Sequence, residues 1–255
     1  MPQRSDLHAL YEKYSGGVAY LDIENADGSH SIGTAFHVRD GVFISARHVV
    51  ENGVIREVAT TVPCGGNGLI WAHQPSKGAV VEGPYFHPNP ATDLAVMKVA
   101  GISAPDIPIG QIHPAELPIL TKVLVLGYPP IPLSNSPVLV AATGEVSAVV
   151  DNYLDGGTHL ILSTMARGGF SGGVAITGGD YYDNEGTLGL ITRSFLRDGQ
   201  PVELGYLAVL PLETIYSCHG LFESELDWYL SPGRKAAGER LVRSGREGSP
   251  SPKER

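Results

Sequence analysis

Short apolar runs rich in Val, Ile and Thr, separated by turns with glycine or proline, follow one another along most of this chain. Its 255 residues include 32 glycines and 19 prolines, which interrupt helices and favour turns. Asp40-Gly41 between two such runs is typical of a hairpin, because this pair tolerates positive φ. The pattern predicts an all-β protein of about a dozen strands, most simply two packed barrels or sandwiches.

Helices are expected only at the two ends of this region, from the helical spacing of apolar residues in the first segment and from the composition of the second. The first segment is Ser5–Tyr14, with Ser5 as its N-cap, and the second is Pro211–His219. The proline-rich stretch Ile102–Pro118 is expected to connect two halves. The expected strands cover residues 18–23, 31–38, 42–45, 54–62, 69–73, 80–86, 94–99, 122–126, 138–150, 159–163, 174–176, 187–194 and 201–209.

Charge and composition limit the function classes. A net charge of −9 argues against a general nucleic-acid binder, which needs a basic face. No run of apolar residues is long enough for a membrane span, and the N-terminus lacks the apolar region of a secretory signal. Because Cys64 and Cys218 are the only cysteines, too few for a typical secreted disulfide framework, we expect a reduced, cytoplasmic setting.

The last residues, 232–255, differ from the rest of the chain. They contain seven Lys or Arg against three Glu and lack apolar periodicity, so we expect them to be disordered. Two interpretations stay open: a solvated end, or an arm that docks an acidic partner or a membrane surface.

Ser171 lies in the run Gly169-Phe170-Ser171-Gly172-Gly173, a setting that packing alone does not explain. Glycine leaves the hydroxyl uncovered and frees backbone N–H groups to face a substrate. A serine hydroxyl is a weak nucleophile until a base accepts its proton. The run therefore predicts a nucleophile, provided that the chain supplies a base.

His48 and Asp93 are the candidates for the base and its partner. His48 is expected to end an apolar strand, after small residues that would let its ring face a cleft. Asp93 opens the apolar strand 94–99, a costly position for a carboxylate unless it is hydrogen-bonded. Taken alone, Asp93 is equally consistent with a turn-capping residue.

The chain order His48, Asp93, Ser171 is the one found in chymotrypsin-like enzymes. On these residues the chain resembles the chymotrypsin-like (trypsin-like) serine peptidases, and more narrowly it is similar to the bacterial branch that includes HtrA-type proteases. The resemblance spans roughly residues 17–219. Its matching segments are residues 33–36, 45–50, 93–96, 126–129, 169–173 and 189–192.

The resemblance implies two six-stranded antiparallel β-barrels with an N-terminal and a C-terminal helix. The implied division is residues 1–16 (helical segment), 17–110 (first barrel), 111–220 (second barrel and closing helix) and 221–255 (C-terminal extension). His48 would act as base, Asp93 would orient it, and Ser171 would attack the scissile carbonyl. The N–H groups of Gly169 and Ser171 would form the oxyanion hole. Neither a metal nor a cofactor is implied, and the substrate would be a protein or peptide.

The same resemblance implies a pocket for the side chain before the cut. One wall would be Met165, Ala166, Arg167 and Gly168, the second Thr192, Arg193 and Ser194, and the third Gly205. Since Met165 would form an uncharged floor, an apolar or small residue is the expected preference.

Three features depart from the family pattern. Phe170 stands where secreted relatives have an aspartate that pairs with a newly cut N-terminus, so activation by such a cut is not expected. Arg47, beside the histidine, is either a solvated charge or a binder of a substrate carboxylate. About 36 residues follow His219, too few for a peptide-recognition domain, so we expect no PDZ domain.

Other function classes were weighed against this one. Gly169-x-Ser171-x-Gly173 also fits the nucleophile elbow of α/β-hydrolases, with His219 as base and Asp183, Asp198 or Asp227 as acid, but a strand and not a helix is expected after the serine. The chain lacks the His-Glu-x-x-His motif that a metal hydrolase would need. A non-catalytic binding module stays an alternative, and so does a form that needs an activating partner, because Gly168-Gly169 is flexible enough to turn an oxyanion donor away.

Overall fold

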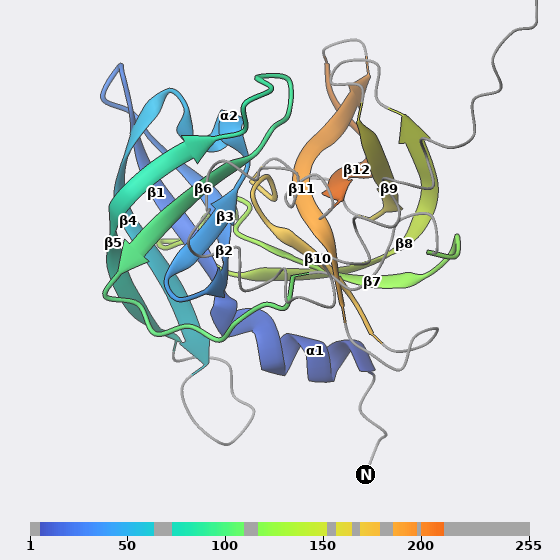
Figure 1. Cartoon of the computed structure of the whole chain (residues 1–255), viewed down its shortest axis with the longest axis horizontal. Helices are drawn as coiled ribbons and strands as arrows, with labels where there is room; N and C mark the ends of the chain where they lie inside the picture. The colour runs from blue at the N-terminus through green and yellow to red at the C-terminus, as the bar shows by residue number, and fades with distance from the viewer. Residues whose placement is uncertain are drawn as a thin grey trace, which may run out of the picture. The chain divides into compact units, whose positions relative to one another are not determined.

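Two closed antiparallel barrels of six strands each make up the described part of the chain (Figure 1). In this computed structural model the described residues are 6–63, 73–109, 117–151, 157–164, 169–178, 186–197 and 200–211. Helix α1, Asp6–Tyr14, and a single 3₁₀ turn, Ser15–Gly17, precede the strands. The all-β prediction with an N-terminal helix is therefore confirmed, while the expected closing helix and basic tail lie outside the described residues.

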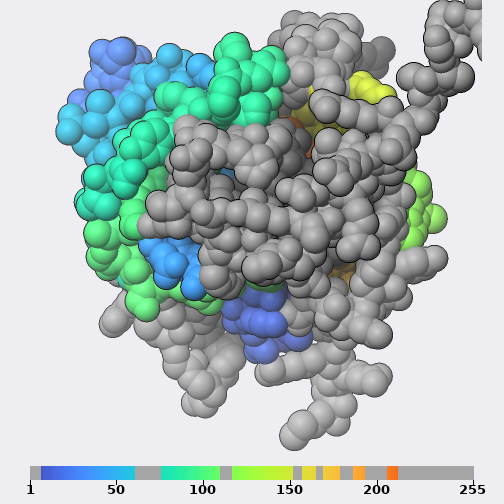
Figure 2. Space-filling model, in the orientation of Figure 1, coloured from blue at the N-terminus to red at the C-terminus, as the bar shows by residue number. Residues whose placement is uncertain are grey.

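The first barrel has the strand order β1-β2-β3-β6-β5-β4. The hairpin between β2 and β3 turns at Asp40 and Gly41, whose φ values of 49° and 80° are those that this residue pair tolerates. In the space-filling view, residues of this barrel form the blue-to-green surface on the left (Figure 2). Its strands are β1 Val18–Asn25, β2 His30–Arg39, β3 Val42–Ser45, β4 Gly53–Pro63, β5 His73–Phe86 and β6 Ala95–Ala100.

The second barrel repeats the architecture with the strand order β10-β11-β12-β9-β8-β7. Ser171 lies in the short connection that leads into β10, and β10 pairs with both β7 and β11. Its strands are β7 Lys122–Gly127, β8 Val140–Asp151, β9 Thr158–Ser163, β10 Val174–Thr177, β11 Gly186–Arg197 and β12 Gln200–Pro211.

Each barrel has an apolar core of its own. Phe43, Met97 and Leu21 are fully buried in the first, and Val123, Leu162 and Phe170 are among the buried residues of the second. Phe170, one residue before Ser171, thus anchors the nucleophile loop in the second core. Burying such a side chain stabilises the fold by roughly 2–3 kcal/mol.

Two local predictions differ from the structure. His48 does not end a strand: β3 stops at Ser45, and His48 lies in the one-turn helix α2, Arg47–Val50. Strand β5 begins at His73, well before the expected residue 80, because pairing with β4 satisfies the backbone of its polar first half. The expected separate strand 69–73 lies mostly outside the described residues, as does the boundary at residue 110, so the domain division stays a prediction.

Candidate active site

His48 and Asp93 form a doubly hydrogen-bonded pair on the first barrel. The backbone N–H of His48 donates to Oδ1 of Asp93 at 2.9 Å, and Nδ1 of His48 lies 2.7 Å from Oδ2. The Asp93 side chain is 10% exposed, whereas that of His48 is 46% exposed. A carboxylate at Nδ1 requires a proton on that nitrogen, so Nε2 of the neutral ring is left as the acceptor.

Local chain geometry produces this pair. Ala46 is extended, with ψ of 141°, and α2 starts directly after it, which turns the His48 backbone N–H and its ring to the same side. Asp93 comes just before β6, the strand that pairs with β3. The two side chains thus approach from neighbouring strand ends, and the buried carboxylate has the hydrogen bonds that its burial requires.

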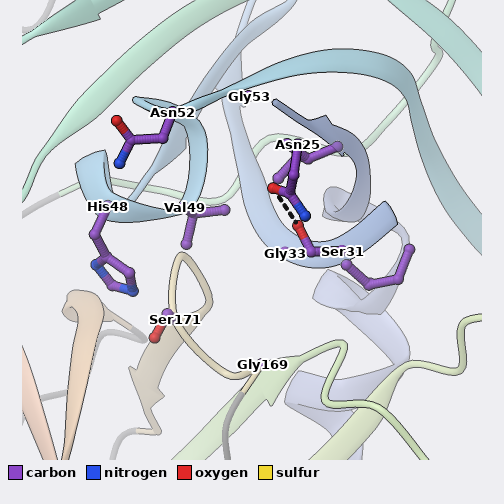
Figure 3. Close-up of a pocket in the computed structure, with 11 residues that line it drawn as sticks. Asn25, Ser31, Gly33, His48, Val49, Asn52, Gly53, Gly169 and Ser171 are labelled. Carbon is purple, nitrogen blue, oxygen red and sulfur yellow. Dashed lines mark hydrogen bonds between the residues drawn. The ribbon is translucent and has the colours of Figure 1, made fainter. Parts of the chain in front are cut away.

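Ser171 faces His48 across a shared cavity (Figure 3). Its hydroxyl donates to the carbonyl of Thr192 on β11 at 3.3 Å, and not to His48. The cavity has a volume of about 320 Å³. Among the described residues that line it, only His48 has a titratable side chain; these residues are Ile23, Asn25, Ser31, Ile32, Gly33, His48, Val49, Asn52, Gly53, Gly169 and Ser171.

The nucleophile loop turns through two glycines in the left-handed region, Gly169 with φ of 98° and Gly172 with φ of 86°. Its carbonyls are bonded: that of Gly169 accepts from the Thr34 hydroxyl at 2.9 Å, and that of Ser171 from the Thr34 N–H at 3.3 Å. Among the described residues, none accepts a hydrogen bond from the N–H of Gly169 or of Ser171. These two donors are the ones predicted for an oxyanion hole.

The structure describes only some of the residues predicted to form the pocket walls. Thr192 is buried in β11, where its hydroxyl donates to the carbonyl of Ala208. Arg193 and Ser194 continue β11, and Gly205 belongs to β12. The first wall, residues 165–168, lies outside the described residues. The map of this pocket therefore stays a prediction.

Two residues at the site were not identified from the sequence as functional. Thr34 contacts the nucleophile loop as given above, and the Ser45 hydroxyl donates to the Thr34 carbonyl at 2.7 Å. Both belong to segments that carry the family resemblance, but a single threonine or serine in a strand gives no signal of a contact with the other barrel.

The described residues contain no His, Cys, Asp or Glu cluster arranged to hold a metal ion. Within the same ranges, no helix has the length and apolar character that crossing a bilayer requires.

Three solved structures with a similar fold are proteases. A variant of the HtrA-type protease AlgW with a tripeptide aligns with a TM-score of 0.60 and 17% identity, covering 83% of this chain and 61% of that one. The active form of the Rv3671c protease from M. tuberculosis aligns with a TM-score of 0.59 and 16% identity, covering 84% of this chain and 82% of that one. The serine endoprotease from Yersinia pestis aligns with a TM-score of 0.58 and 18% identity, covering 84% of this chain and 65% of that one. At these identities the likeness shows the fold.

The chain spans less than two thirds of the AlgW chain that it matches. No match was found among curated proteins. The model of the trypsin-like peptidase domain, however, matches residues 33–180, more than half of the sequence and a range that holds His48, Asp93 and Ser171. By that match the chain belongs to the trypsin-like peptidase domain family, and its fold is that of the proteases above.

Proposed function

We propose that this protein is a serine endopeptidase that cleaves protein or peptide substrates through an acyl-enzyme on Ser171. One observation carries the proposal: the His48–Asp93 pair, joined by two hydrogen bonds, faces Ser171 in one cavity. A base within reach of a serine and oriented by a third group is the arrangement that activates a hydroxyl nucleophile.

The proposed reaction begins when the Ser171 hydroxyl turns from the Thr192 carbonyl toward Nε2 of His48. Oγ then bonds to the scissile carbonyl carbon while Nε2 takes the hydroxyl proton, and the Asp93 carboxylate stabilises the resulting imidazolium. The tetrahedral oxyanion would accept hydrogen bonds from the N–H groups of Gly169 and Ser171. The C–N bond breaks as Nε2 returns the proton to the leaving amine, and water repeats these steps to release the acid.

The substrate would lie across the nucleophile loop, with a separate site for the chain on each side of the scissile bond. The residue before the cut would enter the pocket bounded by residues 165–168, 192–194 and 205, with the predicted preference for an apolar or small side chain. The cavity that His48 and Ser171 share is formed mainly by the first barrel, from residues such as Ile23, Ile32 and Val49. It would receive the leaving chain next to His48, the group that protonates the leaving amine.

A fluorophosphonate probe tests the proposal directly, because it bonds covalently only to an activated serine. We expect labelling of the wild-type chain and no labelling of Ser171→Ala. A peptide-library cleavage profile then supplies the preference before and after the cut. A folded wild-type chain that neither labels nor cleaves would contradict an endopeptidase that is active alone.

One observation favours a second candidate, a form that an activating partner switches on: the Ser171 hydroxyl bonds Thr192 and not His48. Catalytic hydrogen bonds of a free enzyme often form only when substrate is bound, so substrate itself could provide the switch. Labelling that rises when cell extract is added would support a separate activator. Equal labelling with and without extract would argue against one, and absence of both labelling and cleavage in either case would leave a non-catalytic binding module.

A further inference from the structure

Thr34, in the middle of β2, lies where three segments of the molecule meet. It is fully buried, and its register partner in β1 is Tyr20. Its hydroxyl accepts from the backbone N–H of Tyr128 at 2.9 Å and donates to the carbonyl of Gly169 at 2.9 Å. One first-barrel hydroxyl thus joins two segments of the second barrel, the end of β7 and the nucleophile loop.

The peptide groups of the nucleophile loop are fixed one by one. The Gly169 carbonyl bonds the Thr34 hydroxyl, and the Phe170 carbonyl accepts from the N–H of Gly173 at 2.8 Å. The Ser171 carbonyl accepts from the Thr34 N–H, while Gly172 N–H donates to Ile191 at 2.8 Å. Because a peptide group is planar, a bonded carbonyl also sets the direction of the N–H in the same plane. The Ser171 N–H shares its peptide plane with the Phe170 carbonyl, and the peptide groups on both sides of that plane are each bonded to Thr34.

The nucleophile loop and the end of β7 pack closely against their neighbours. A Cβ built on Gly172 would lie 1.9 Å from the Thr34 carbonyl oxygen, and one on Gly127 would lie 2.8 Å from the Phe170 ring and 3.4 Å from the Thr34 hydroxyl. A Cβ on Gly169 would lie 2.6 Å from Pro129. Without the hydroxyl, the half-buried Gly169 carbonyl would lose this hydrogen bond, which favours a rearranged loop.

We propose that Thr34 is a positioning residue for the reaction, an inference that rests on the proposed function. Its hydroxyl holds the loop of Gly169 and Ser171 so that the oxyanion donors keep their alignment with His48, which stands on the same barrel as Thr34. The role needs the hydroxyl itself and not only the volume of the side chain, so serine should replace threonine and valine should not.

The test compares Thr34→Val, which has the same shape without the hydroxyl, with Thr34→Ser. Removing one oxyanion donor costs about 10²–10³-fold in kcat. Misaligning the donors should cost somewhat less, so we expect kcat for a peptide ester and the fluorophosphonate labelling rate to fall by about 10–100-fold in Thr34→Val. KM should change by less than about threefold, because the loss is confined to the transition state. Thr34→Ser should stay within about threefold of wild type.

A transition-state mimic separates positioning from general destabilisation. A peptide aldehyde forms a hemiacetal whose oxygen occupies the oxyanion hole, so its affinity should fall with kcat in Thr34→Val while substrate KM does not. Thr177→Val is the matched control: Thr177 is buried in β10 and its hydroxyl donates to the Lys122 carbonyl at 2.9 Å, away from the loop. It should lower the melting temperature and leave kcat and aldehyde affinity unchanged.

A folded Thr34→Val that labels and binds aldehyde like wild type would overturn the inference. If that variant does not fold, Thr34→Cys takes its place, since a thiol fills similar space but bonds weakly. A Cys variant with wild-type rates would overturn the inference equally. Failure of the proposed function would look different, because the wild-type chain itself would then not be labelled.

Discussion

The two barrels share a topology but hold their functional groups in different ways. In the first barrel, His48 and Asp93 are positioned by neighbouring strand ends and bond each other within that barrel. In the second barrel, the loop of Ser171 relies on Thr34 of the other barrel for two of its carbonyl bonds. The base and its partner are therefore a local product of one barrel, whereas the nucleophile loop depends on the contact between the two.

The described residues of the two barrels also offer two kinds of polar bond to compare. Ion pairs join strands on the outside of the first barrel, Arg56 with Glu24 and Lys77 with Glu57. In the second barrel, threonine hydroxyls donate to backbone carbonyls, as in Thr164 to Thr143. Exposed ion pairs contribute little to stability, while buried hydroxyl bonds fix backbone direction. Substitutions at the outer ion pairs and at the buried hydroxyl bonds should therefore separate stability from activity.

The largest effect is expected from the pair within the first barrel. Asp93→Asn keeps the shape of the side chain but places an amide N–H₂ or a neutral oxygen opposite Nδ1. The ring then loses the partner that fixes its tautomer and stabilises its cation, so kcat should fall by about 10⁴-fold. Steady-state kinetics on a peptide substrate measures it. A loss of less than about tenfold would show that Asp93 does not orient the base.

The next effect tests the contact between the barrels. Gly172→Ala should lower the free energy of unfolding by several kcal/mol, on the order of 3–5, because its Cβ would overlap the Thr34 carbonyl and its φ of 86° suits glycine. Labelling of Ser171 should fall with it. Gly28→Ala is the control, since Gly28 has φ of 79° but nothing within 4 Å of a Cβ. It should cost only about 1–2 kcal/mol, and equal losses in both variants would rule out an effect of the contact.

The difference between contacts within one barrel and contacts between the two barrels also decides what could be predicted from the sequence. The Asp-Gly hairpin, the strand periodicity of both barrels and the order of His48, Asp93 and Ser171 are local signals, and the all-β class, the N-terminal helix and the family followed from them. The helix at His48 was missed, because one turn is too short to leave a periodic pattern.

Contacts between the barrels left no comparable signal. Thr34 has the composition of an ordinary strand residue, and its bonds to Tyr128 and Gly169 join positions 94 and 135 residues away. Only the packing of two separate barrels brings these groups together. The glycines around Ser171 pointed to the loop, but their close approach to β2 depends on that packing.

A smaller effect is expected at the predicted pocket floor. Met165→Asp should raise kcat/KM for cleavage after Lys or Arg by about tenfold or more relative to cleavage after Leu, because a carboxylate there would pair the basic side chain. Cleavage of matched peptides that differ only at this residue measures the change. Met165→Leu should keep the apolar preference. An unchanged ratio in Met165→Asp would place Met165 outside the pocket.

The smallest effect concerns the outer bonds of the first barrel. Glu57 accepts hydrogen bonds from Lys77 and Tyr20, and Lys77 first and Tyr20 second lower the pKa of this carboxyl below its ordinary value of 4.5. A lowered pKa in the folded state stabilises the protein above pH 4.5, and this contribution is lost as the pH falls through the folded-state pKa. Glu57→Gln should therefore lower the free energy of unfolding by about 1 kcal/mol at neutral pH and make little difference at a pH below the folded-state pKa.

Denaturant unfolding at neutral and at acidic pH measures this contribution, with Glu24→Gln as the control at a similarly exposed ion pair. Labelling of Ser171 should stay unchanged in both variants, because neither carboxylate contacts Thr34 or the nucleophile loop. If Glu57→Gln reduced labelling as Gly172→Ala is expected to do, the outer surface of the first barrel would be coupled to the loop. Contacts within the first barrel and contacts between the barrels would then not be independent, because any loss of stability in the first barrel would lower the labelling of Ser171.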